Sequence, residues 1–141
     1  MKNWLVDAQK RDISVCGALT DPKGDRNLPP HKQKDPGMNL RIVENRDGGI
    51  VVRGAKVQIA GAAASHEIFV LPGSGYKTED KEYSVSFVAP KDANGITIVE
   101  ARHPSDGRDF EDGWDNPVKC GGITQGYIFF EDVFVPEERV F

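Results

Sequence analysis

The residues best suited to chemistry in this chain form one polar stretch near its start. Residues 19–26 read LTDPKGDR, which places a hydroxyl, two carboxylates and two cations directly after the apolar run Ile13–Leu19. Such a loop could present hydrogen-bonding and charged groups to a ligand. The same letters are also ordinary turn chemistry, since proline fixes φ and glycine allows φ > 0. Local composition alone favours a solvated turn over a ligand-binding loop, so other motifs of the chain must distinguish the two.

A second feature is the run of small residues Gly61-Ala62-Ala63-Ala64, which follows a strand-like segment. Small residues at a strand end allow close approach of a flat ligand or of another backbone. Together with the polar loop, this run could bracket one planar molecule. A tight crossing inside the core would give the same pattern, and the two interpretations stay open at this point.

Two other motifs carry the letters of a site without its spacing. Ser65-His66-Glu67 contains a hydroxyl, an imidazole and a carboxylate, but neighbours on a strand point to opposite faces and cannot form a relay. Gly73-Ser74-Gly75 lacks the third glycine, the lysine and the helix of a phosphate-binding loop. We therefore assign no catalytic residue in this chain.

No metal site is predicted either. The three histidines, His31, His66 and His103, occupy separate segments, and neither Cys16 nor Cys120 has a second soft ligand nearby. The two cysteines are about a hundred residues apart, which is not a disulfide framework. We expect both to be free thiols.

The elements that must position these residues are short strands. Fifteen glycines and nine prolines favour frequent turns over long helices. Alternating apolar residues and the hairpin signal Asp47-Gly48-Gly49 predict a mainly β fold. We expect a small antiparallel β-barrel of about seven or eight short strands, with a sandwich as the alternative. The predicted strands cover residues 13–19, 39–46, 50–59, 66–71, 83–89, 96–99, 123–130 and 132–135.

Bulk properties exclude several classes of function. The 141 residues suit one domain. The net charge of −4 is spread along the chain, without the basic stripe that nucleic-acid binding needs. No run reaches the length of a membrane helix and no secretory signal is present, so we expect a cytoplasmic protein. Residues 3–12 predict a short helix, which resembles the end of a longer one.

Four stretches in this order resemble a known family: ALTDPKGDRN, DGGIVVRGAKVQIAGAAASHEIFVLP, FVAPKDANGITIV and YIFFEDVFVPEERVF. The chain is similar to the 4-hydroxyphenylacetate 3-hydroxylase and 4-hydroxybutyryl-CoA dehydratase family, which has the acyl-CoA dehydrogenase fold. The resemblance implies that residues 13–141 are the flavin-facing middle β-barrel. Residues 1–12 would end a helix of a missing N-terminal helical domain, and a C-terminal helical domain would also be missing.

The resemblance also implies a cofactor, FAD, in the full-length protein. The polar loop would contact the flavin and its pyrophosphate, and the small-residue run would lie beside the flavin ring. Hydrogen-bond donors there can tune the flavin, and cations can meet phosphates. The implied cofactor-binding residues are Leu19, Thr20, Lys23, Gly24, Asp25, Arg26, Ala60, Gly61 and Ala62.

The resemblance implies an enzyme with two possible reactions. One is a flavin-dependent 4-hydroxybutyryl-CoA dehydratase/vinylacetyl-CoA isomerase, whose iron–sulfur cluster would be bound by the missing domains. The other is a two-component 4-hydroxyphenylacetate 3-monooxygenase. Many relatives have a histidine at the position of Gly17, and some dehydratases have a threonine at that of Ala60. The substrate would be an acyl-CoA or a phenol, and the full-length enzyme a homo-oligomer. A third hypothesis is that the isolated barrel is an inert structural or interaction module.

Overall fold

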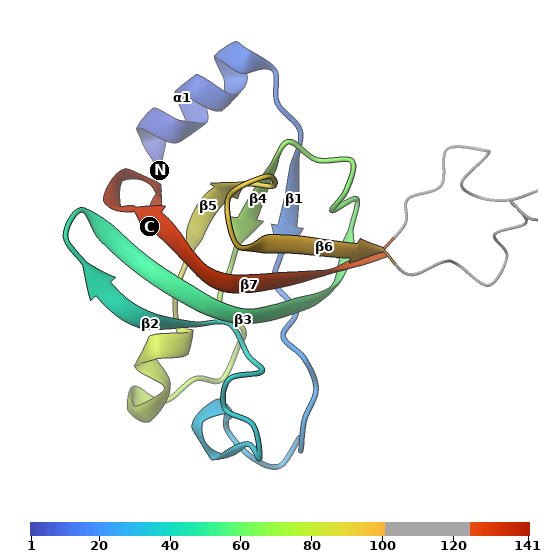
Figure 1. The fold of residues 1–141 in the computed structure, drawn as a ribbon, viewed down its shortest axis with the longest axis vertical. Coiled ribbons are helices and arrows are strands. Elements are labelled where there is room, and N and C mark those ends of the chain that lie inside the picture. The colour runs from blue at the N-terminus through green and yellow to red at the C-terminus, as the bar shows by residue number, and fades with distance from the viewer. Residues whose placement is uncertain (101–124) are drawn as a thin grey trace, which may run out of the picture.

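The computed structural model describes residues 1–100 and 125–141, which form one short helix, seven strands and three 3-10 helices (Figure 1). Two predictions concern residues outside the described ranges: that His103 binds no metal, and that Cys120 is a free thiol. The elements in order are α1 (Lys2–Arg11), β1 (Val15–Ala18), η1 (Pro30–Lys32), β2 (Arg41–Arg46), β3 (Gly49–Ala60), β4 (Glu67–Val70), η2 (Thr78–Tyr83), β5 (Phe87–Pro90), β6 (Ile96–Glu100), β7 (Gln125–Pro136) and η3 (Glu137–Arg139).

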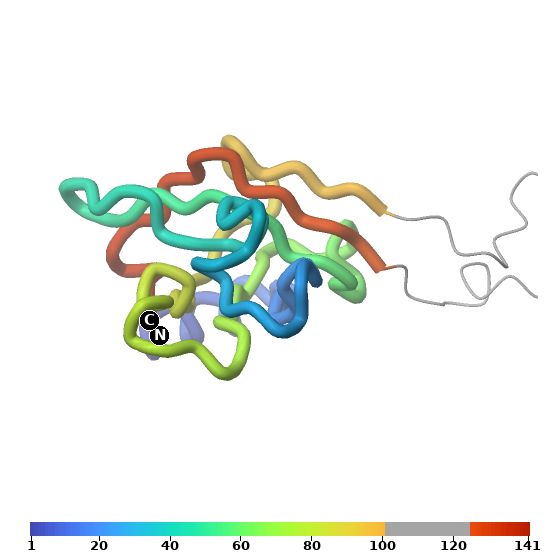
Figure 2. Tube along the Cα trace, turned by 90° about the horizontal axis from the view of Figure 1, so that it is seen from below, coloured from blue at the N-terminus to red at the C-terminus, as the bar shows by residue number. Residues whose placement is uncertain are grey.

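The strands form two open sheets that face each other (Figure 2). One has the order β1-β4-β5, and the other has the order β2-β3-β7-β6. The mainly β class is confirmed; among the described residues the strands form two open sheets instead of the expected β-barrel, because no strand ladder joins the two sheets there. The expectation of antiparallel pairing also fails at one place, since β1 lies parallel to β4. Apolar alternation fixes which face of a strand is buried but not which strand it pairs with.

The long strands β3 and β7 curve because each contains a bulge. The β3–β7 register shifts at two places: β7 has an extra residue between the partners of Val52 and Gly54, and β3 has one between Lys56 and Ile59, where Gln58 has φ +57°. In β7 the extra residue lies beside Asp132, which has φ +53°. The side chain of Arg53 donates two hydrogen bonds to the Asp132 carboxylate, at 2.8 and 2.7 Å. Bulges increase local twist, which lets these strands wrap the core.

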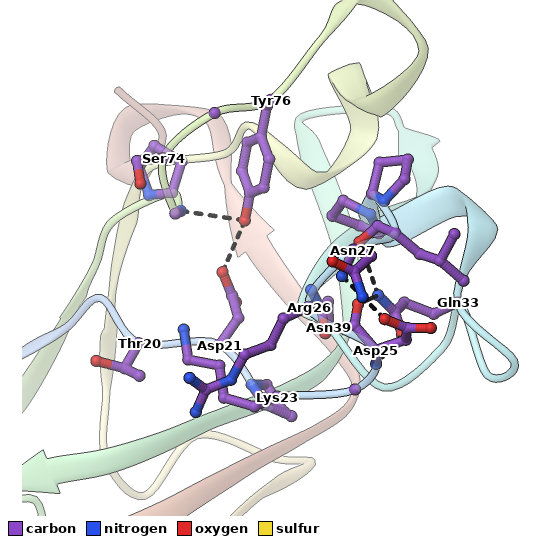
Figure 3. Close-up of a pocket in the computed structure, with 18 of the residues that line it drawn as sticks. Thr20, Asp21, Lys23, Asp25, Arg26, Asn27, Gln33, Asn39, Ser74 and Tyr76 are labelled. Atoms are coloured by element: carbon purple, nitrogen blue, oxygen red, sulfur yellow. Dashed lines mark hydrogen bonds between the residues drawn. The ribbon is translucent and has the colours of Figure 1, made fainter.

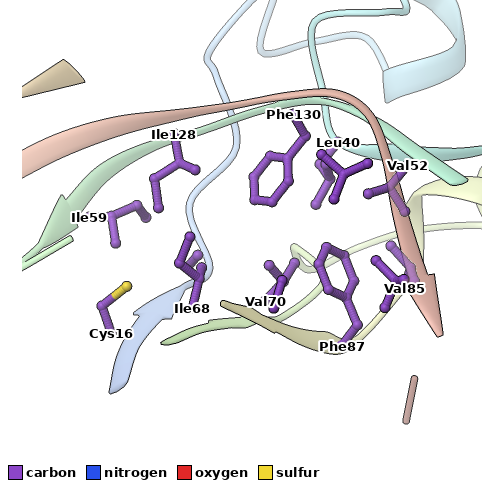
Figure 4. Close-up of a cluster of buried hydrophobic side chains, with 14 of the residues drawn as sticks. Cys16, Leu40, Val52, Ile59, Ile68, Val70, Val85, Phe87, Ile128 and Phe130 are labelled. Carbon is purple, nitrogen blue, oxygen red and sulfur yellow. The ribbon is translucent and has the colours of Figure 1, made fainter. Parts of the chain in front are cut away.

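Apolar side chains of the two sheets meet between them (Figure 4). Phe87 on β5 and Phe130 on β7 are 0% and 1% exposed, and their rings meet edge to face at 5.9 Å. Cys16 is buried there as a free thiol, as predicted. Burial of these side chains removes apolar surface from water, which is the main favourable term in folding.

One predicted strand, over residues 83–89, begins later than expected. Only Phe87–Pro90 is strand, and Thr78–Tyr83 is a 3-10 helix. The buried Asp80 carboxylate accepts hydrogen bonds from the Lys77 N–H at 3.2 Å and from His31, whose Nδ1 lies 2.7 Å away. These contacts hold the turn in place. Tyr83 is nevertheless buried, as the alternation predicts, and its hydroxyl donates to the Pro36 carbonyl.

The chain ends meet on one face of the β1-β4-β5 sheet. Glu67 on β4 is 3% exposed and accepts hydrogen bonds from Trp4 and Arg11 at 2.8 Å, and from Arg139 at 3.1 Å. The Trp4 ring lies 6.1 Å from that of Phe141. The helix predicted over residues 3–12 is thus confirmed as α1, while its membership of a larger helical domain stays a prediction. No helix among the described residues is long and apolar enough to cross a membrane.

Candidate functional site

A pocket of about 810 Å³ opens between two loops (Figure 3). The first wall, residues 19–30, follows β1, and the second wall, residues 72–77, follows β4. Because β1 and β4 are parallel neighbours, the two loops leave the same edge of the sheet. Gln33 and Asn39 complete the lining.

Lys56 on β3 supports the base of both walls. Its side chain is 2% exposed, and Nζ lies 2.7 Å from Oδ1 of Asp21. Nζ also donates to the carbonyls of Leu19 at 3.1 Å and Leu71 at 2.9 Å. Burial lowers the pKa of Lys56 and the Asp21 carboxylate opposes this, with a net lowering. The ammonium therefore makes two hydrogen bonds and one ion pair at the starts of the two loops.

The Asp21 carboxylate continues this network to the second wall. Its Oδ2 accepts a hydrogen bond from the Tyr76 hydroxyl at 2.7 Å, and that hydroxyl accepts one from the Gly73 N–H at 3.1 Å (Figure 3). Burial, reinforced by Asp21, raises the pKa of Tyr76. Tyr76 therefore stays a neutral donor over the whole physiological range of pH.

The tip of the first wall is organised around the side-chain amide of Gln33. Its Oε1 accepts the Asp25 N–H at 2.9 Å, and its Nε2 donates to the carbonyls of Asp25 and Leu28, each at 2.8 Å. The Asn27 N–H donates to the Asp25 carboxylate at 2.9 Å. A Cβ on Gly24 would collide with Gln33 Oε1. The glycine is thus needed for close approach of the amide, not for a positive φ.

The six residues predicted in the polar loop all line this pocket: Leu19, Thr20, Lys23, Gly24, Asp25 and Arg26. The side chains of Lys23 and Arg26 are exposed and have no hydrogen-bond or ion-pair partner among the described residues. The loop is therefore exposed but ordered. The side chains of Lys56 and Gln33 hydrogen-bond to its backbone, while the cations of Lys23 and Arg26 remain free to bind a ligand.

The three residues predicted in the small-residue run lie apart from the pocket lining. Ala60 is exposed at the end of β3, and Gly61 has φ +68° in the turn that follows. Ala62 is fully buried, and a Cβ added at Gly126 would lie 3.2 Å from the Cβ of Ala62. The two regions are connected by a hydrogen bond from the Val57 N–H to the Thr20 carbonyl at 2.9 Å. Contact of these residues with a ligand stays a prediction.

Sequence reasoning missed the residues that hold the loop. Lys56 interrupts an apolar strand, and a lysine at a buried strand position needs partners, which is a signal that could have found it. Gln33 and Tyr76 carry no such signal in the sequence, because their partners are backbone groups and a carboxylate distant in sequence. The segment Gly73–Gly75, set aside as a phosphate loop, forms the second wall instead.

The triad letters separate as expected. The Ser65 hydroxyl donates to the Ala62 carbonyl at 2.9 Å, and Nδ1 of His66 lies 2.9 Å from the Ser14 hydroxyl. Glu67 points to the Trp4 side of the sheet. Among residues 1–100 and 125–141, no three His, Cys, Asp or Glu side chains come close enough together to hold a metal ion.

Comparison with protein families matches residues 1–141 to the family described as 4-hydroxyphenylacetate 3-hydroxylase N terminal. The 4-hydroxybutyryl-CoA dehydratase/vinylacetyl-CoA-Δ-isomerase of Clostridium aminobutyricum is 45% identical over 140 residues, which are 98% of this chain and 29% of that enzyme. The chain thus spans less than a third of the length of this relative.

Solved structures show the same relationship. A 4-hydroxybutyryl-CoA dehydratase from N. maritimus matches with a TM-score of 0.86 and 33% identity, over 99% of this chain and 28% of that one. The oxygenase component of 4-hydroxyphenylacetate 3-monooxygenase, complexed with FAD, matches at 0.82 and 28% identity, over 99% and 28%. A glutaryl-CoA dehydrogenase from Mycobacterium smegmatis, at 0.58 and 16% identity, over 99% and 29%, shows that the fold is acyl-CoA dehydrogenase-like.

Proposed function

Because this chain belongs to the 4-hydroxyphenylacetate 3-hydroxylase N-terminal family, we propose that it is the flavin-facing domain of a flavin-dependent enzyme. The reaction we propose is that of a 4-hydroxybutyryl-CoA dehydratase/vinylacetyl-CoA isomerase. The 45% identity to an enzyme with that name supports this choice. The alternative is the oxygenase component of a 4-hydroxyphenylacetate 3-monooxygenase, which the fit to such a structure with FAD favours.

The observation that carries the proposal is the pocket with its unpaired cations. Lys23 and Arg26 line it from a loop whose backbone is fixed by Lys56 and Gln33. Two positive charges on a rigid loop fit the diphosphate of FAD, since charge-assisted hydrogen bonds to phosphate oxygens are the strong ones. The donors present thus match the chemistry of the implied cofactor.

The chain's own residues would bind and orient the cofactor. Thr20 offers a hydroxyl in the first wall, close to where Val57 pairs with the loop. Gly61, without a side chain, leaves room at the end of β3 for a flat ring. When bound, the flavin supplies the redox chemistry. In this proposal the proton-transfer groups and any iron–sulfur cluster belong to parts of the enzyme beyond these residues.

The relatives are more than three times as long as this chain. We propose that helical domains on either side of it complete the cofactor site in a homo-oligomer that acts on an acyl-CoA or a phenol. The isolated domain is then inactive and binds FAD weakly, because it supplies only part of the contacts.

Titration of the chain with FAD, followed by the amide resonances of the isotope-labelled protein, tests the proposal. We expect saturable binding with a dissociation constant above about 1 μM and shifts concentrated in residues 19–26 and 60–62 and in the second wall, residues 72–77. The Lys23→Ala/Arg26→Ala variant should bind about tenfold or more weakly, at about 1 kcal/mol per lost contact. Lys10→Ala, which removes an exposed lysine of α1, is the control.

Resonances of the loop that do not move at saturating FAD would refute the proposed site. Sub-micromolar affinity would refute the weaker claim that the domain needs its neighbours.

A further inference from the structure

We infer that Lys56 is the positioning residue of the pocket: its buried ammonium, with Asp21 and Tyr76, sets the separation of the two walls. The inference rests on the proposed function, because it concerns the same pocket. It assigns a role to a side chain that does not line the pocket and that no motif identifies.

The contacts of the ammonium group come from three parts of the chain. Lys56 extends from β3 in one sheet and donates to the carbonyl of Leu19, where the first wall begins. It also donates to the carbonyl of Leu71, where the second wall begins. Leu19 directly follows β1 and Leu71 directly follows β4, and these two parallel strands belong to the other sheet. One cation therefore joins the starts of both walls to the opposite sheet.

A second connection crosses between the walls themselves. Asp21 in the first wall accepts from Tyr76 in the second, and Tyr76 accepts from Gly73. A Cβ on Gly73 would lie 2.6 Å from Asp21 Oδ2 and 2.7 Å from the Tyr76 hydroxyl. There is no room for a methyl group, so the walls meet at a closely defined distance.

The charge of Lys56 is what keeps Asp21 at this junction. Asp21 is 9% exposed, and a buried carboxylate without a cation is costly. Without the ammonium, Asp21 would retain only the Tyr76 hydroxyl and would turn toward water. The first wall would then move with it, and with that wall the ligand-facing Lys23 and Arg26.

Amide hydrogen exchange on four variants of the chain tests this role without relying on a ligand. Lys56→Met removes the charge and keeps most of the stem, and Asp21→Asn removes the opposite charge. Gly73→Ala disturbs the Asp21–Tyr76 contact and leaves Lys56 in place. Arg53→Met, which breaks an exposed ion pair between the central strands β3 and β7, is the matched control.

We expect exchange of the Val57 N–H, which pairs with the Thr20 carbonyl, to accelerate about tenfold or more in the first three variants. Amides of the β6–β7 ladder should keep their rates, as should all amides in the control. Equal acceleration throughout the chain would mean that Lys56 only stabilises the fold, and it would overturn the inference, as would unchanged rates at Val57. If Lys56→Met does not fold, Asp21→Asn decides by the same criterion, because it removes the charge that faces the Lys56 ammonium.

The same variants are then titrated with FAD. We expect affinity to fall about tenfold with the loss of loop order. If the unmodified chain does not bind FAD while exchange at Val57 responds as expected, the proposed cofactor is wrong and the positioning role stands. If FAD binds equally to all variants, the positioning role is wrong and the proposed function stands.

Discussion

Gly24 tests how far the pocket depends on the order of its first wall. The Gly24→Ala change adds one methyl group, which would collide with Oε1 of Gln33 and lie 3.0 Å from the end of Met38. Gln33 cannot move its amide aside without losing contacts, because that amide makes three hydrogen bonds to the loop. The methyl group therefore acts on the whole tip of the loop.

The magnitude follows from those three hydrogen bonds. At a net ~0.5–1.5 kcal/mol each they are worth ~1.5–4.5 kcal/mol. Water replaces part of this, because Asp25 is exposed and Gln33 is only half-buried. Replacing glycine also stiffens the unfolded chain and returns ~0.4–1 kcal/mol. We expect a net local loss of about 1–2 kcal/mol and a correspondingly weaker FAD affinity, by up to about thirtyfold.

A double-mutant cycle with Gln33→Ala is the assay. Each single variant should accelerate exchange of the Asp25 N–H, which donates to Gln33. The double variant should look like Gln33→Ala alone, since the alanine at position 33 makes room for the methyl group. Gly17→Ala is the control, because a Cβ there meets nothing within 4 Å. Additive effects of the two changes, or an Asp25 amide that exchanges normally in Gly24→Ala, would refute the reasoning.

Two further predictions concern the stability of the domain. Burial opposes the ionisation of Glu67, but its three hydrogen-bond donors outweigh burial and hold its pKa below the ordinary 4.5. The ionised Glu67 therefore stabilises the fold above pH 4.5, and this stabilisation is lost as the pH falls through the lowered pKa. Melting curves between pH 7 and 3 should show this loss, and Glu67→Gln should be less stable at neutral pH but less sensitive to acid; equal acid sensitivity would contradict the assignment. Phe87→Ala should cost about 3–5 kcal/mol in denaturant unfolding, because it empties the space beside Phe130 between the sheets, and a loss below about 1 kcal/mol would contradict its central place.

The fold was predictable wherever local pattern decides the structure. The hairpin turn at Gly48 follows from residue types whose backbone preferences are strong. Closure of the sheets was not predictable, because it depends on pairing between edges far apart in sequence. The start of β5 was missed for a related reason. The turn before it is held by His31 and the Lys77 backbone through Asp80, and one of these partners is distant in sequence.

The candidate site divides in the same way, and the division has a physical cause. The residues that face the pocket are contiguous, so their composition marks them as a group. The residues that hold the loop are scattered, because fixing a loop from behind needs support from elements that are close only in the folded chain. Lys56, Gln33 and Tyr76 belong to three different segments.

The two groups also differ in how well their polar atoms are paired. Lys56 has its three oxygen partners, while Lys23 and Arg26 have none among the described residues. Leaving cations unpaired costs nothing in water, whereas leaving Lys56 unpaired inside the protein would be expensive. The buried Lys56 must therefore be paired within the folded protein, whereas the exposed Lys23 and Arg26 can remain unpaired until a ligand binds. A substitution of Lys56 should accordingly change the local stability of the loop and the affinity together, and one of Lys23 or Arg26 should change affinity alone.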